Sequence, residues 1–113
     1  MDDVGRAEQA RPMRVRVLIY AVAPEADPDG VERAYHQISG ALAGVPGLLG
    51  NELLREVGRD EAKFVVLSEW ESMSAFQRWE QGAGHHETTA PLRPYQDSRH
   101  GRSFTLYEVT ARY

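Results

Sequence analysis

The stretch from Lys63 to Trp79 constrains the fold more than any other part of the chain, because the sequence changes there from a strand pattern to a helix pattern. Phe64 to Leu67 form a continuous apolar run with two valines at its centre, which is typical of a strand covered on both faces. Ser72 is a preferred helix N-cap, and apolar residues recur behind it at helical spacing: Met73, Phe76 and Trp79. The stretch therefore predicts a strand that leads directly into a helix, with Trp70 at the junction and directed between sheet and helix.

The N-terminal part of the chain predicts one strand and one helix. Arg14 to Val22 has the pattern of a strand that becomes buried on both faces once its two arginines are passed, and two prolines end it. Asp29 followed by Glu32 has the spacing of a capping box, in which each side chain bonds a free backbone N–H of the first turn. Apolar residues at helical spacing then predict a helix from about Asp29 to Leu42: Val31, Ala34, Tyr35, Ile38, Ala41 and Leu42.

Glycine-rich and proline-rich breaks divide the rest of the chain. Gly44 to Gly47 ends the helix, a strand is expected at about Leu48 to Val57, and the turn cluster Gly58 to Glu61 makes this strand and the next an antiparallel hairpin. A glycine-rich triplet ends the second helix. Two prolines then limit His85 to Tyr95 to a short helix at best, and a fourth strand is expected from Ser103 to Tyr113.

The order β-α-β-β-α-β is that of the α+β ferredoxin-like fold, in which an antiparallel four-stranded sheet carries both helices on one face. A sheet that is apolar on both faces would leave its other face bare in water, and a patch of that size usually marks a partner surface. The simplest partner is a second copy, so we expect a homodimer with facing sheets, a dimeric α+β barrel. We expect one domain, residues 13–113, behind a flexible N-terminal tail, residues 1–12.

The composition excludes several classes of function. The net charge is −4 and the basic residues are scattered, so neither nucleic acid nor an anionic membrane is expected as a partner. No stretch approaches the ~18 apolar residues that a membrane span needs. The chain has no cysteine, which is compatible with a cytoplasmic location. Its four histidines include only one adjacent pair, so no metal site is expected.

Short motifs carry a likeness that covers about Val15 to Val109: Val45 to Gly50, Ser68 to Ser72, Ala75 with Phe76, Trp79, and the pair His85 and His86. In these motifs the sequence resembles the antibiotic biosynthesis monooxygenase family. The resemblance implies a dimeric α+β barrel. It leaves the chemistry open, because the same barrel is shared by cofactor-independent oxygenases that form quinones in aromatic polyketide pathways, by quinol oxygenases, by haem-degrading enzymes and by proteins of unknown activity.

Carried over by position, the resemblance makes Trp70 a residue of the substrate pocket. The polyketide oxygenases have an Asn four residues before that Trp, and some have a Tyr six residues after it, where this chain has Val66 and Phe76. The haem-degrading branch has its Trp at the position of Trp79 and a His ten residues later, which is Thr89 here, and it needs an Asn on the first strand that this chain lacks. The resemblance therefore argues against haem, and we expect no tightly bound cofactor.

Oxygenation without a cofactor requires a substrate that itself supplies an electron to dioxygen. A phenolate or an anthrone enolate can do so, provided that the protein removes a proton and stabilises the oxyanion in a dry cavity. His85 or His86 could be the base or an oxyanion donor, since both follow a glycine-rich helix end and titrate near neutral pH. Arg93 could supply a fixed positive charge for the enolate. Two adjacent histidines in a polar loop can also be simply solvated, and a surface arginine needs no function to explain it.

Seven further residues are candidates for contact with a flat apolar substrate: Trp70, Phe76, Trp79, Tyr20, Tyr35, Val66 and Asn51. The aromatic residues also suit an ordinary core, whereas Asn51 is a candidate for the missing amide. The sequence thus predicts a cofactor-independent monooxygenase that oxidises a polycyclic aromatic polyketide (an anthrone, phenol or quinol) to a quinone. The alternatives are a polyketide cyclase, a non-catalytic aromatic-binding protein, and an oxygenase that uses reduced flavin.

Overall fold

The domain consists of four strands and four helical segments in the residues that the structure, a computed structural model, describes: 13–98, 101 and 104–113. In chain order the elements are β1 (Val15–Val22), α2 (Gly30–Leu42), β2 (Leu48–Arg55), β3 (Lys63–Trp70), α3 (Met73–Glu80), α4 (His85–Thr89), the 3-10 helix η1 (Ala90–Tyr95) and β4 (Phe104–Glu108). The predicted N-terminal tail, residues 1–12, lies outside the described residues.

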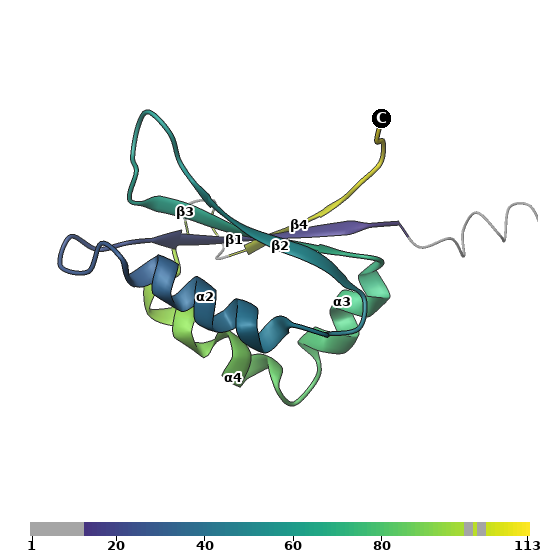
Figure 1. The fold of residues 1–113 in the computed structure, drawn as a ribbon. Coiled ribbons are helices and arrows are strands. Elements are labelled where there is room, and N and C mark those ends of the chain that lie inside the picture. The colour runs from purple at the N-terminus through teal and green to yellow at the C-terminus, as the bar shows by residue number, and fades with distance from the viewer. Residues whose placement is uncertain (1–12, 99–100, 102–103) are drawn as a thin grey trace, which may run out of the picture.

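The strands form one antiparallel sheet in the order β2-β3-β1-β4, and the helices lie on one of its faces (Figure 1). This arrangement confirms the ferredoxin-like fold. Trp70 pairs with Val15 of β1 and with Leu48 of β2, so the end of β3 lies in the interior of the sheet. Because side chains alternate along a strand, Phe64, Val66 and Trp70 all point toward the helices, where they are buried.

The junction of β3 and α3 follows the sequence prediction. Ser72 caps α3 with its Oγ, which accepts a hydrogen bond from the backbone N–H of Ala75 at 3.1 Å. Gly47, with φ of +84°, lies directly against Ala75, where a Cβ would overlap the alanine methyl group. Its carbonyl also accepts from the backbone N–H of Glu71 at 2.8 Å. The start of β2 is therefore held tightly against the start of α3.

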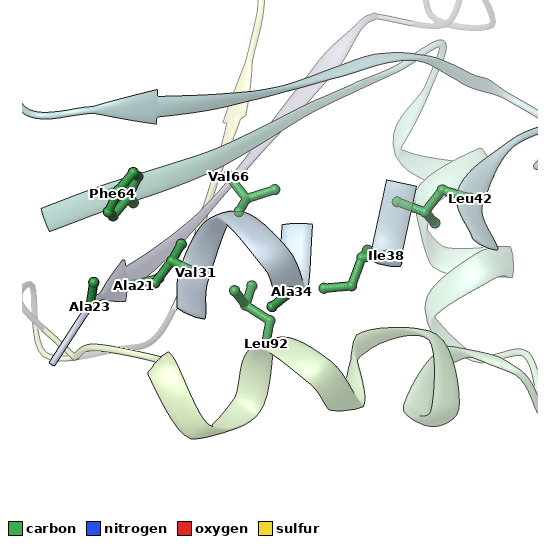
Figure 2. Close-up of a cluster of buried hydrophobic side chains, with 9 residues drawn as sticks. All are labelled: Ala21, Ala23, Val31, Ala34, Ile38, Leu42, Phe64, Val66 and Leu92. Atoms are coloured by element: carbon green, nitrogen blue, oxygen red, sulfur yellow. The ribbon is translucent and has the colours of Figure 1, made fainter. Parts of the chain in front are cut away.

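The core fills the layer between sheet and helices in two clusters. Figure 2 shows the first, in which α2 and η1 pack on β1 and β3: Ala21, Ala23, Val31, Ala34, Ile38, Leu42, Phe64, Val66 and Leu92. The second cluster packs α3 against the other end of the sheet: Val15, Val17, Trp70, Ala75 and Phe76. Of the six residues expected to form the apolar stripe of α2, four are buried (Val31, Ala34, Ile38 and Leu42), Tyr35 is half-buried and Ala41 is exposed.

Two local predictions were wrong. The Asp29 side chain makes no capping bond, so there is no capping box; Asp27 instead accepts from the Arg33 guanidinium at 2.8 and 2.9 Å and from the Tyr95 hydroxyl at 2.7 Å. These bonds fasten η1 to the start of α2. The fourth strand ends at Glu108 rather than at Tyr113, because β1, its only partner in the described sheet, begins at Val15, opposite Glu108.

The outer face of the sheet is only partly covered within one chain. Val65 and Leu67 are half-buried, Leu54 is 42% exposed and Tyr107 is 55% exposed. The strand predicted to be covered on both faces is thus fully covered on the helix side alone. The outer face keeps an apolar centre, beside which Arg16 and Arg112 form ion pairs with Glu69 at 3.4 and 3.5 Å.

Candidate functional site

A cavity of about 170 Å³ lies between the sheet and the helices. Its floor and walls are mainly apolar, with side chains from β1, α2, β3 and η1: Val17, Ile19, Ile38, Leu42, Val66 and Leu92. A smaller polar set reaches it from β2, β3, α3 and the segment after α3: Asn51, Ser68, Glu80, His85, Arg93 and Gln96. An apolar chamber with a few polar groups is the usual form of a site for a small organic ligand.

Three aromatic side chains form one wall of the cavity. Trp70 is 1% exposed, and its ring centroid lies 5.6 Å from that of Phe76 in an edge-to-face arrangement. Trp79 adds to the wall, with its centroid 5.3 Å from Trp70. The indole Nε1 of Trp70 donates to Ser68 Oγ at 3.0 Å, so the polar atom of this ring is satisfied inside the site. Trp70 and Phe76 are buried, so the half-buried Trp79 provides the accessible aromatic surface of this wall.

His85 begins α4 and packs edge-on against Trp79, with ring centroids 4.4 Å apart. Its Nδ1 is buried and has no hydrogen-bond partner within the described chain. Burial lowers the pKa of His85 below its ordinary value, the Glu80 carboxylate opposes this effect, and the Arg93 guanidinium adds to it. His85 is therefore a neutral imidazole at pH 7, and its ring lines the cavity.

His86 and Arg93 are joined to each other. The Arg93 guanidinium lies 2.8 Å from His86 Nδ1 and donates to the His86 carbonyl at 2.6 Å, and it reaches Thr89 Oγ1 at 3.4 Å. Because a guanidinium has only donors, His86 Nδ1 must be the acceptor, and the ring proton is then on Nε2. Both side chains are exposed at the edge of the cavity. Arg93 thus fixes the tautomer of His86 and fastens η1 to α4.

Asn51 is held by the helix above it. Its Oδ1 accepts hydrogen bonds from the hydroxyl of Tyr35 at 2.5 Å and from that of Ser39 at 3.0 Å. Tyr35 and Ser39 lie one turn apart on α2, so both hydroxyls reach the same point of β2. The orientation of the amide is set by these two bonds.

Eight of the ten predicted site residues line the cavity: His85, His86, Arg93, Trp70, Phe76, Trp79, Val66 and Asn51. Tyr20 and Tyr35 are not part of the lining. Tyr20 lies on the opposite face of the sheet, where its hydroxyl is 2.9 Å from Thr105 Oγ1, and Tyr35 contacts Asn51 instead.

Sequence reasoning missed five lining residues with chemical or aromatic character: Ser68, Glu80, Thr89, Gln96 and Phe104. Ser68 could have been found from strand alternation, since it lies two residues before Trp70 on the same face. Gln96 and Phe104 come from segments whose positions depend on the whole fold, so local sequence carries no signal for them.

Neither a metal-binding cluster nor a membrane-spanning helix is found in the part of the chain that the structure describes. No three residues among His, Cys, Asp and Glu come together as a metal site there. None of the described helices combines the length and the apolar character that crossing a bilayer requires.

The fold and the cavity define a class of protein, the ferredoxin-like domains with an apolar cavity between sheet and helices. Within this class, the chain belongs to the antibiotic biosynthesis monooxygenase family, whose sequence model matches residues 13–91.

Three known proteins show what this chain is similar to. Protein SchA of Streptomyces halstedii is 30% identical over 98 residues, which are 87% of this chain but only 26% of SchA, so the chain spans about a quarter of that relative. A mycobilin-producing heme oxygenase of Mycobacterium tuberculosis is 39% identical over 77 residues, 63% of this chain and 71% of the relative. The crystal structure of SnoaB, a cofactor-independent oxygenase from Streptomyces nogalater, matches with a TM-score of 0.66 at 22% identity and covers 90% of this chain and 95% of SnoaB.

Proposed function

We propose that this protein is a cofactor-independent monooxygenase that oxidises an aromatic polyketide, an anthrone, phenol or quinol, to a quinone. The observation that carries the proposal is the neutral, unpartnered imidazole of His85 beside an aromatic wall in a mainly apolar cavity. Membership of the family and the fold shared with SnoaB support the same chemistry. A cytoplasmic location stays a prediction.

In the proposed reaction, His85 removes a proton from the methylene carbon of the anthrone and leaves an enolate. The enolate transfers one electron to dioxygen, and the two radicals recombine to form a C–O bond. The imidazolium returns its proton to the peroxide. His85 then takes the second proton from the same carbon, the O–O bond breaks, a carbonyl forms, and hydroxide leaves and recovers that proton as water. One CH2 group and one O2 thus become one C=O group and one H2O, without an external reductant.

The size of the cavity limits how a substrate is bound. At about 170 Å³ it is close to the engineered cavity of about 150 Å³ that holds one benzene molecule. One or two rings of a polycyclic substrate therefore fit inside, and the remaining rings lie at the mouth, beside the exposed side chains of His86, Arg93 and Gln96. The reacting ring is the one that reaches His85.

Haem does not fit this site. The macrocycle contains four pyrrole rings, whereas the cavity has room for one or two rings. The position ten residues after Trp79 is Thr89, whose hydroxyl donates to the His85 carbonyl at 3.0 Å and is buried. The similarity to the heme oxygenase thus supports the fold of this chain, and we propose no step that uses haem.

Oxygen uptake tests the function directly. Metal-free protein given anthrone should consume one O2 per quinone formed, well above the rate for anthrone alone, and added reduced flavin or haemin should not raise the rate. Uptake that needs reduced flavin would replace the proposal by the flavin-assisted alternative, and uptake that needs haemin would place the protein with the heme oxygenases. Binding of anthrone without uptake under any condition would favour a cyclase or a binding protein.

We also propose that the outer face of the sheet is covered by a second copy of the chain. The support is its apolar centre, formed by Leu18, Leu54, Val65 and Leu67, in a sheet that has helices on its other face only. A hydrophobic face of this kind usually marks an interface, and a twofold axis brings the same patch of two copies together.

Leu67→Asp should convert the dimer to a monomer, because two copies would each bury an unpaired carboxylate at the interface. Light scattering on a size-exclusion column should give about twice 12.7 kDa for the wild type and about 12.7 kDa for the variant. Val57→Asp is the matched control, since Val57 is 87% exposed in a turn. A monomeric wild type, or a dimeric Leu67→Asp variant, would contradict the proposal.

A further inference from the structure

Two polar residues of the cavity lie opposite each other on neighbouring strands. Asn51 of β2 pairs in register with Ser68 of β3, and both line the cavity. Val66 and Trp70, two residues before and after Ser68, are both buried on the helix-covered face, so Ser68 and Asn51 share that face. The pair forms a small polar spot in a wall that is otherwise apolar.

The oxygen atoms of both side chains already accept hydrogen bonds. Asn51 Oδ1 accepts from the hydroxyls of Tyr35 and Ser39, and Ser68 Oγ accepts from the Trp70 indole, which can only donate. What remains on each side chain is a donor, the amide N–H of Asn51 and the hydroxyl O–H of Ser68. Neither donor has an acceptor in the described part of the chain.

We propose that Asn51 Nδ2 and Ser68 Oγ together bind the phenolate or enolate oxygen of the substrate, an inference that rests on the proposed function. Two donors on one developing negative charge in a mainly apolar cavity are an effective oxyanion site, because little water competes for the charge. Tyr35 and Ser39 are positioning residues, since they hold the amide with its oxygen toward α2 and its nitrogen available to the cavity.

The site also selects a class of substrate. A cavity with two unsatisfied donors favours an aromatic ring that carries an oxygen over the same ring without one, because the hydrocarbon would leave both donors unpaired. The substrate is therefore oriented with its oxygenated edge toward the β2–β3 pair.

Binding of 1-naphthol and of naphthalene tests this site without any turnover. Both molecules fit a one-ring to two-ring cavity, and they differ only in the hydroxyl group. The wild type should prefer 1-naphthol by about tenfold or more, and absorbance titration of the complex should show that the pKa of bound 1-naphthol is lowered, since hydrogen bonds to a charged group are strong.

Three variants separate the parts of the site. Asn51→Asp replaces the amide donor by an oxygen of the same size, so the preference should fall to about onefold and the pKa of bound 1-naphthol should rise, because the new carboxylate opposes the naphtholate. Ser68→Ala should lower the preference about threefold or more. The double change Tyr35→Phe with Ser39→Ala leaves Asn51 in place, and it should raise the pKa of bound 1-naphthol while naphthalene affinity stays unchanged.

Gln77→Glu is the matched control for Asn51→Asp, since it adds the same charge at an exposed position of α3. A wild-type preference near onefold, or one that Asn51→Asp and Ser68→Ala both leave unchanged in folded protein, would overturn the donor site. The result is separate from the oxygenase proposal. If the protein consumes oxygen with anthrone but shows no preference for 1-naphthol, the oxygenase proposal stands and the donor site is overturned. If it shows the preference and the variant effects but consumes no oxygen, the donor site stands and the oxygenase proposal is overturned.

Discussion

Replacing His85 with glutamine should lower kcat for anthrone oxidation by about 10²–10⁴-fold, the contribution typical of a positioned general base. Glutamine keeps the size and polarity of the side chain but cannot accept a proton at neutral pH. His85 lines the cavity, and burial lowers its pKa, so the ring is a neutral base at pH 7. An oxygen electrode with anthrone, corrected for oxidation in the absence of protein, measures the loss.

The pH dependence of the wild type should report the same group. Burial lowers the pKa of His85 from its ordinary value of 6.5, so the base form is already present at pH 7 and kcat should fall only as the pH drops below 6.5. Folding stability should change with pH in the same direction, because His85 binds a proton more readily in the unfolded chain than in the folded chain. The contribution of His85 to the free energy of unfolding is therefore complete above pH 6.5 and is lost as the pH falls toward the lowered pKa. His85→Gln should remove both effects.

His86→Gln is the informative comparison for His85→Gln. Arg93 occupies Nδ1 of His86, so this ring has no free lone pair, and its replacement should reduce kcat by less than about tenfold. Equal losses in the two variants would mean that the pair acts through the shape of α4 rather than through one base. A loss below tenfold in both would remove the histidines from the mechanism.

The fold could be predicted because its signals are local. The apolar run before Trp70 and the cap at Ser72 are set by neighbours in sequence, and both appear in the structure as expected. The predicted capping box does not form, and the start of α2 is instead held by contacts that depend on the tertiary structure. Asp27, not Asp29, meets Arg33 and Tyr95, and Tyr95 is brought there only by the folded chain.

The site could be predicted only in part, because the residues that face the cavity are selected by the alternation of side chains along strands and by their rotation around helices. His85 and His86 are adjacent, but successive residues of a helix point about 100° apart, so His85 packs on Trp79 whereas His86 meets Arg93. Tyr20 was a plausible lining residue until the register placed it on the outer face. Strand alternation places Ser68 on the same face as Trp70, but its hydrogen bond to the indole is seen only in the folded chain.

Replacing Trp70 with alanine should lower the free energy of unfolding by about 3–5 kcal/mol, the usual cost of truncating a buried large aromatic. Trp70 is 1% exposed, and it joins the end of β3 to α3 through Phe76 and Trp79, with ring centroids at 5.6 and 5.3 Å. Since small domains are stable by about 5–15 kcal/mol, the loss is a large share of the total. Urea denaturation followed by circular dichroism measures it.

Trp79 separates the structural role of this aromatic wall from its chemical role. Trp79 is half-buried, so Trp79→Ala should destabilise the fold less than Trp70→Ala does, but it removes the ring against which His85 packs at 4.4 Å. We therefore expect the loss of kcat, relative to the loss of unfolding free energy, to be larger for Trp79→Ala than for Trp70→Ala. A Trp70→Ala variant that loses less than about 1 kcal/mol would contradict the packing argument, because a side chain this buried can be removed cheaply only if the space around it collapses.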